Sequence, residues 1–142
     1  MRNKILAGFV IGLLSVSDAV GACLQGHPTV RYEYSHSNAV FLGTVLSAKL
    51  APAEDSAGFL DGSVYKVRTD KILRGKLPDT VDIFSENSSG RFPMEVGQQY
   101  LLFVYSDLGR IMVDNCGNSG PVAETSSVLK QIRQIQQQQK SK

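Results

Sequence analysis

Two long apolar segments and several shorter ones predict a chain built mainly from β-strands. Ala39–Leu50 is rich in β-branched and apolar residues and contains Gly43, which favours a strand with a bend or bulge at that glycine. Within Ser63–Leu73 the apolar positions change parity near Thr69–Lys71. A slip of one residue is what a β-bulge produces, so we expect a second bulge there.

Three shorter segments complete the predicted sheet. Val81–Phe84 is a short strand, and Ile111–Val113 pairs back across a turn at Asp107–Arg110. Gln99–Ser106 is apolar without alternation, which is typical of a central strand covered on both faces. Polar loops separate the strands at Ala51–Asp61, Arg74–Asp79 and Glu86–Arg91. A meander of five bulged strands can close on itself and remove its edges, which predicts a small OB-type barrel.

The hydrophobic period changes after Glu124 and predicts a C-terminal helix. One helical face carries Val128, Leu129, Ile132 and Ile135. Residues 136–142 are rich in Gln and Lys, and we expect a disordered tail there. The predicted fold is therefore mainly β, with one domain over residues 23–135, a C-terminal α-helix, and a helical turn or loop at Val30–Ser37.

The first 22 residues have the layout of a secretory signal peptide. Arg2 and Lys4 form a positive start, and Ile5–Val16 is a nearly unbroken apolar run. The run is too short to cross ~30 Å of hydrocarbon as a helix. We expect the chain to be exported and to act in the extracellular space or the periplasm.

The sequence is compatible with two signal-peptide cleavage sites. Cleavage after Ala19 and cleavage after Ala22 both place small or tolerated residues at the −3 and −1 positions. Val20–Cys23 also resembles a bacterial lipobox, in which Cys23 would be acylated. A lipid-anchored envelope protein with a structural or assembly role is therefore an alternative, and only in that form would the chain meet a membrane.

Composition and charge narrow the function classes. The 142 residues are 42% hydrophobic and 20% charged, which excludes wholesale disorder. The net charge is only +2, so a general polyanion-binding surface is not expected. The basic stretch from Tyr65 to Lys76 is interpreted as a solvated strand face, and nucleic acid is not an expected partner.

Nothing in the residue pattern predicts catalysis or a cofactor. His27 and His36 are the only histidines, and zinc sites need three or four ligands at fixed geometry. Neither histidine has partners at ligand spacing, so no metal site is predicted. Asp79 and Asp82 are placed in a turn and on a solvent face rather than as an acid–base pair. We therefore expect a protein that is not an enzyme.

An exported chain with two cysteines most simply forms one disulfide, here Cys23–Cys116. Two free thiols, or one acylated and one free cysteine, are the alternatives. A bridge closing so long a loop would contribute roughly 4–5 kcal/mol in the chain-entropy model.

The chain resembles the netrin-like family, that of the tissue inhibitors of metalloproteinases (TIMPs) and their small secreted bacterial relatives. The matching segments, in order, are Cys23 with His27-Pro28, Ser37–Val45, Tyr65-Lys66-Val67, Arg74-Gly75, Phe92–Phe103 and Asn115-Cys116-Gly117. The resemblance implies a TIMP-like OB barrel with packed helices, a non-enzymatic role and a protein partner, a protease among the candidates.

The resemblance also points to a contact surface. In the inhibitors a Cys-x-Cys pair opens the mature chain, and its first cysteine chelates the zinc of the target protease. Cys23 matches the second cysteine of that pair, whereas Gly21 stands at the first, and the missing partner would fall near Ser89-Gly90. One bridge is thus absent, although inhibition through a free amine on Cys23 is a further alternative. The expected binding edge is Cys23, Leu24, Gln25, His27 and Pro28, together with the loops Ala51–Asp61 and Glu86–Arg91.

Overall fold

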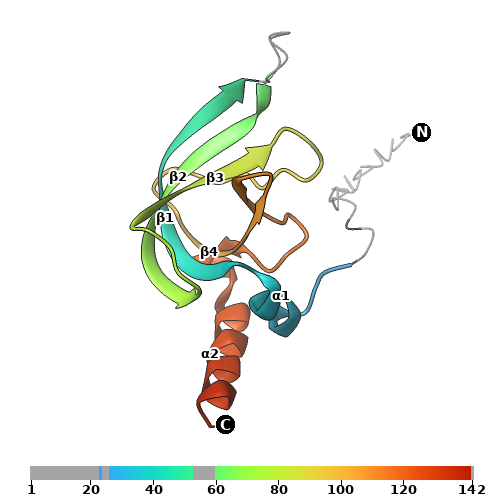
Figure 1. Cartoon of the computed structure of the whole chain (residues 1–142), viewed down its shortest axis with the longest axis vertical. Helices are drawn as coiled ribbons and strands as arrows, with labels where there is room; N and C mark the ends of the chain where they lie inside the picture. Colours follow the sequence, from blue (N-terminus) through green and yellow to red (C-terminus); the bar gives the residue numbers. More distant parts are fainter. Residues whose placement is uncertain (1–22, 24–25, 53–59, 142) are drawn as a thin grey trace, which may run out of the picture.

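The computed structural model describes Cys23, residues 26–52 and residues 60–141, which form a closed sheet with helices at one end (Figure 1). The predicted signal peptide lies outside the described residues, as do Leu24 and Gln25. A mainly β chain with a C-terminal helix is confirmed. In chain order the elements are α1 (Val30–His36), β1 (Ala39–Pro52), β2 (Leu60–Arg74), β3 (Thr80–Glu86), β4 (Gln99–Asp107), β5 (Arg110–Val113), β6 (Gly120–Pro121), the 3-10 helix η1 (Val122–Glu124) and α2 (Ser126–Lys140).

Five strands close into a ring. β1 pairs antiparallel with β2, β2 with β3, β4 with β5, and β4 also with β1. The remaining link is a parallel pairing of β3 with β5, in which Ile83 lies opposite Ile111 and Phe84 opposite Met112. The short strand β6 pairs with β4 as an additional neighbour. Because each ring strand has a partner on both sides, the ring leaves few backbone groups at a free edge.

Apolar side chains form two clusters, one on each face of the sheet. One cluster lines the inside of the ring and includes Phe41, Val45, Val67, Val81, Ile83, Tyr100, Leu102 and Val104. The other lies under the helices and consists of Val30, Tyr34, Val40, Leu101, Phe103, Ile132 and Ile135. Consecutive residues of β4 belong to opposite clusters, so this strand is buried on both faces, as its unbroken apolar run predicted.

The bulge predicted in β2 is confirmed and lies opposite Gly43, whereas the extra residue of β1 is Leu46, between Val45 and Ser47, rather than at the glycine. The β1–β2 register shifts between Leu42 and Gly43, where Asp70 of β2 is the extra residue. A Cβ atom on Gly43 would lie 2.6 Å from side-chain atoms of both Phe41 and Val67. Glycine at this position therefore lets two core side chains pack against the bent strand.

The ends of β1 and β2 extend further than the sequence predicted. Ala51 pairs with Gly62, and Pro52 pairs with Leu60, so both ends of the predicted loop Ala51–Asp61 belong to strands. Residues 53–59 of that loop lie outside the described residues.

The C-terminal helix is also longer than predicted. Instead of giving way to a disordered tail after Ile135, α2 continues through Lys140. The Gln136 side-chain amide donates to the Leu73 carbonyl oxygen at 2.8 Å and to the Tyr34 hydroxyl at 3.3 Å. These contacts with β2 and α1 hold the helix in a stretch whose composition alone suggests fraying.

Candidate functional site

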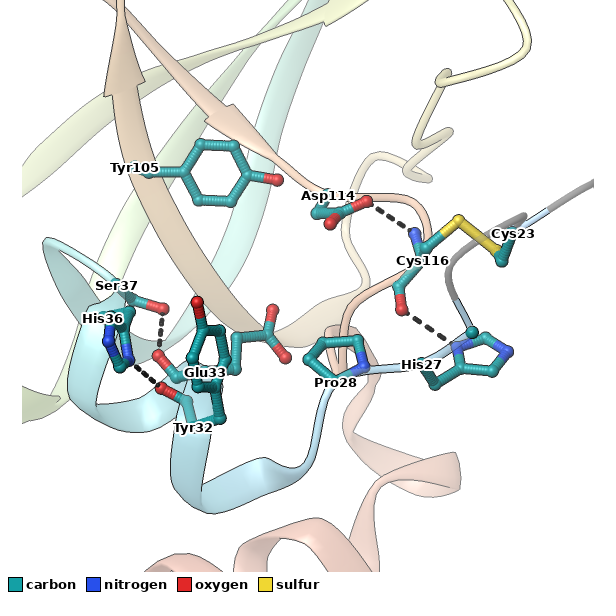
Figure 2. A pocket seen from close by; sticks show the side chains of 11 residues that line it. Cys23, His27, Pro28, Tyr32, Glu33, His36, Ser37, Tyr105, Asp114 and Cys116 are labelled. Carbon is teal, nitrogen blue, oxygen red and sulfur yellow. Dashed lines mark hydrogen bonds between the residues drawn. A yellow bond between two sulfur atoms is a disulfide. The ribbon is translucent and has the colours of Figure 1, made fainter.

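A cavity of about 520 Å³ opens between α1, the end of β4 and the turn after β5 (Figure 2). This volume falls within the range of about 300–1,000 Å³ that is typical of ligand pockets. Its lining consists of Cys23, Gly26, His27, Pro28, Tyr32, Glu33, His36, Ser37, Tyr105, Asp114 and Cys116. We use the name pocket edge for Cys23, residues 26–28, α1 and residues 114–118.

The Cys23–Cys116 disulfide fixes the N-terminal segment beside the cavity. The two Cα atoms are 5.7 Å apart, and the predicted bridge is confirmed. His27 Nδ1 lies 2.9 Å from the Cys116 carbonyl oxygen. Because a carbonyl oxygen only accepts, Nδ1 is the protonated nitrogen of this ring. The disulfide and this hydrogen bond together hold the N-terminal segment against the turn after β5.

Glu33 joins three parts of the pocket edge. Its side chain is only 7% exposed, and Figure 2 shows its carboxylate directed into the space between Pro28, Tyr105 and Asp114. Oε2 accepts from the Asn118 backbone N–H at 2.7 Å and from the Asn118 side-chain amide at 2.6 Å. The same amide donates to the Pro28 carbonyl oxygen at 3.0 Å. Oε2 therefore joins α1 to the turn after β5, and the Asn118 amide joins that turn to the N-terminal segment.

The second Glu33 oxygen, Oε1, is buried as well. No described residue donates a hydrogen bond to Oε1. A Cβ atom at Gly117 would collide with this oxygen, so the glycine is what permits the turn to approach so closely. Burial raises the pKa of Glu33, the Asn118 hydrogen bonds oppose that rise, and the charge of Asp114 adds to it. The net direction is upward because burial outweighs the hydrogen bonds.

Asp114 adds a second carboxylate to the cavity lining, and Tyr105 adds a neutral hydroxyl. Asp114 Oδ1 accepts from the Cys116 backbone N–H at 2.8 Å, which holds the turn. Burial raises the pKa of Tyr105, and the charges of Asp114 and Glu33 raise it further, so its hydroxyl stays neutral. Among the described residues that line the cavity there is no lysine or arginine.

An aromatic pair forms one rim. Tyr32 and His36 stack with ring centroids 4.0 Å apart, and Tyr32 is 57% exposed. His36 Nδ1 lies 2.8 Å from the Tyr32 carbonyl oxygen, so it too carries the proton on Nδ1. These contacts present a flat aromatic surface at the mouth of the cavity.

The described part of the chain contains no group of three or more His, Cys, Asp or Glu side chains placed to hold a metal ion. The sulfur atoms of Cys23 and Cys116 are bonded to each other. The Nδ1 atoms of His27 and His36 are each hydrogen-bonded to a backbone carbonyl oxygen. The cavity therefore offers acceptors, aromatic faces and one buried carboxyl group rather than a free thiolate with a base.

The structure brings together part of the predicted binding edge. Cys23, His27 and Pro28 all line the cavity, while Leu24 and Gln25 lie outside the described residues. The loop Glu86–Arg91 approaches the same turn, because the Asn115 side-chain amide lies 3.4 Å from the Ser89 carbonyl oxygen. Of the loop Ala51–Asp61, the described end lies beside residue 87, whose N–H donates to the Asp61 carbonyl oxygen at 2.9 Å.

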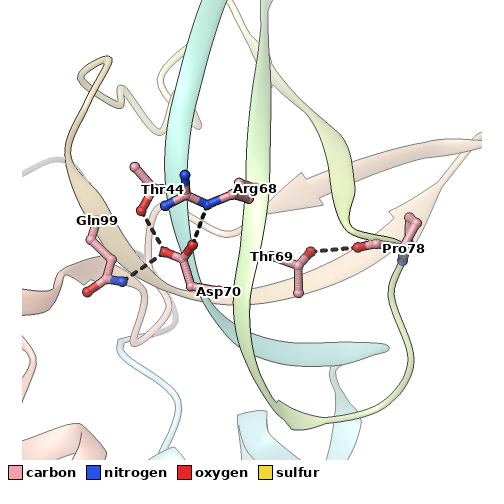
Figure 3. Close-up of polar contacts among 6 residues, drawn as sticks. All are labelled: Thr44, Arg68, Thr69, Asp70, Pro78 and Gln99. Atoms are coloured by element: carbon pink, nitrogen blue, oxygen red, sulfur yellow. Dashed lines mark hydrogen bonds and ion pairs between the residues drawn. The ribbon is translucent and has the colours of Figure 1, made fainter.

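The basic stretch of β2 is largely occupied by local contacts. Tyr65 is buried in the ring and 7% exposed. Lys66 lies 3.3 Å from Asp82, whereas Arg74 donates to the carbonyl oxygens of residues 35 and 37. A second network lies at the bulge, where Asp70 accepts from Thr44, Arg68 and Gln99 (Figure 3).

Sequence reasoning missed Glu33, Tyr105 and Asp114 as members of the site. A glutamate in a short polar helix is normally solvent-exposed, and only the packing of the 114–118 turn buries this one. Tyr105 belongs to the apolar run that predicted a central strand. The one available signal was the position of Asp114 and Asn118 around Cys116, which the disulfide brings next to the N-terminal segment.

No helix in the described ranges has the length and apolar character needed to cross a bilayer.

Comparisons with known proteins do not identify the chain. No protein-family model matches the chain, and no curated protein matches it in sequence. The function is therefore argued from the pocket edge itself.

Proposed function

We propose that this protein is a non-catalytic module that binds another protein through the pocket edge. The observation that carries the proposal is the buried Glu33 carboxylate, which is directed into the cavity. The disulfide holds the N-terminal segment beside the same cavity. Burying a carboxyl oxygen without a donor costs free energy, on the order of 1–3 kcal/mol. A partner that supplies the missing interaction recovers that cost on binding.

The fold proposed for this role is an OB-type barrel of the TIMP-like class. Three features support it: the closed ring of five strands, the bulges at Asp70 of β2 and Leu46 of β1, and the helix packed outside the sheet. The family resemblance in the segments around both cysteines points the same way. Members of the family that the chain resembles bind their partners with the N-terminal segment, and the pocket edge includes that segment.

Export to an oxidising compartment is part of the proposal. Disulfides persist in secreted and periplasmic proteins and are rare in the cytosol, which supports a secreted or periplasmic location. The bridge also bears on the lipid-anchored alternative. Acylation would use the Cys23 sulfur, and that sulfur is bonded to Cys116, so the released form is favoured.

Inhibition of a metalloprotease is less well supported than protein binding in general. Chelation in the inhibitors uses the amine and carbonyl of the first cysteine. Here the Cys23 carbonyl oxygen already accepts from the Gly26 N–H at 2.9 Å. A zinc ion would compete with that hydrogen bond, so we propose contact through the cavity rather than through a chelate.

Photo-crosslinking in the native cell tests the proposal and does not require the partner to be identified beforehand. We place a benzophenone amino acid at Tyr32, on the rim, and for comparison at Lys130, which is exposed on α2 and does not line the cavity. We expect a protein adduct of discrete mass from position 32 and none of that mass from position 130. The same adduct from both positions, or no adduct from a folded protein labelled at 32, would contradict the proposal.

A further inference from the structure

The chemistry of the cavity indicates the charge of the group that enters it. Glu33 is 7% exposed, its Oε1 has no donor among the described residues, and Asp114 stands across the same space (Figure 2). Within the part of the chain that the structure describes, the lining includes no lysine or arginine that could neutralise either carboxylate. The buried Glu33 carboxylate attracts a cation more strongly than it would in open water, and the exposed Asp114 carboxylate adds its charge beside it.

The walls indicate the shape of that cation. Tyr32 and Tyr105 supply aromatic rings, and Pro28 supplies an apolar face. A guanidinium group is planar, weakly hydrated and able to stack on aromatic rings while it donates several hydrogen bonds. An ammonium group is compact and strongly hydrated, so it loses more solvation on entering such a site.

We propose that the cavity at the pocket edge is a receptor for an arginine side chain of the protein partner, with Glu33 as its principal anionic contact and Asp114 as a second. The inference rests on the proposed function, because it names the group through which the partner engages the edge. The upward direction of the Glu33 pKa agrees with it, since the protein alone does not offset the buried charge and an entering cation does.

The test uses the purified, disulfide-bonded protein and small probes. Nα-acetyl-arginine N-methylamide is titrated by two-dimensional NMR against Nα-acetyl-citrulline N-methylamide, which has nearly the same shape and no charge. We expect saturable shifts confined to α1, residues 26–28 and residues 114–118, with a Kd on the order of 1 mM for a probe of this size. Citrulline that shifts the same residues with equal affinity would overturn the proposal.

Two variants separate recognition from structural support. Glu33→Gln retains an acceptor for Asn118 but removes the charge, and we expect arginine binding to weaken at least tenfold. Asp79→Asn changes the net charge by the same amount at an exposed residue outside the cavity, and we expect the wild-type affinity. Unchanged binding by a folded Glu33→Gln variant, or equal weakening in both variants, would show that Glu33 is not the contact.

The choice of guanidinium over ammonium and the proposed function are tested separately. An n-butylammonium probe that binds as tightly as the arginine probe would overturn the choice of guanidinium. A Tyr32 adduct that forms equally well in Glu33→Gln would overturn the arginine receptor and leave protein binding at the edge intact. Arginine binding without any adduct at position 32 would overturn the protein-binding function on which the inference rests.

Discussion

Glu33 is the residue whose environment differs most from what its type leads one to expect. A carboxyl group in a short helix is normally solvated, yet this one is 7% exposed and receives two hydrogen bonds on one oxygen only. The other oxygen lies close to Gly117 and has no donor among the described residues. Its effect on the protein is therefore tied to its protonation state.

We predict that Glu33 makes the folded protein less stable as pH rises. Its folded-state pKa lies above the usual value of 4.5, so the folded state holds this proton more tightly than the unfolded state. Its favourable contribution is fully present below pH 4.5 and is lost as pH rises through the raised pKa. Urea unfolding of wild type and Glu33→Gln between about pH 4 and 8 measures the difference.

The comparison with Glu33→Gln cancels the other titrating groups around the cavity. Asp114, His27, His36, Tyr32 and Tyr105 face the same space and are present in both proteins. The stability of wild type relative to the variant should therefore fall with rising pH. A difference that stays constant with pH, or that grows in favour of wild type, would show that burial does not dominate at Glu33.

At the scale of elements, Asp70 stabilises the bulge that bends β2. Its side chain accepts from Thr44 Oγ1 at 2.6 Å, Arg68 Nε at 2.8 Å and Gln99 Nε2 at 2.8 Å, which joins β1, β2 and β4 (Figure 3). Partial burial raises the pKa of Asp70, but these hydrogen bonds and the Arg68 charge outweigh it, so the net direction is downward.

We predict that Asp70→Ala lowers the free energy of unfolding by about 1–3 kcal/mol, because three donors lose a charged acceptor. Asp82→Ala is the matched control. It removes an exposed pair with Lys66, 3.3 Å apart, and such pairs contribute about 0–1 kcal/mol. Urea denaturation of both variants measures the two changes. Equal losses would mean that the bulge does not depend on the Asp70 network.

The elements differ in how far sequence could predict them. The parity slip of β2 reflects a one-residue bulge, and the unbroken apolar run of β4 reflects burial on both faces. Both features are visible in the local sequence and were predicted. The length of α2 depends on Gln136 reaching the Leu73 carbonyl oxygen across the fold, which no local pattern contains. The cavity likewise depends on distant residues, so sequence identified Cys23, His27 and Pro28 but not Glu33.

At the scale of the molecule, the Cys23–Cys116 disulfide joins the start of the described chain to the turn that follows β5. The cysteines are 93 residues apart, and closing a loop of that length contributes about 4–5 kcal/mol in the chain-entropy model. The ring itself closes through the parallel pairing of β3 with β5. The bond thus adds the N-terminal segment to a sheet that already has its own closure.

The affinity of the partner for the edge with and without this bond is the most direct measurement. The protein recovered in the Tyr32 adduct is titrated with wild type and with Cys23→Ala/Cys116→Ala, at a temperature where hydrogen exchange shows the β4 amides still protected in both. We predict at least tenfold weaker binding by the double variant, because residues 26–28 no longer stay beside Glu33. Equal affinity from the folded double variant would contradict a disulfide-held binding edge.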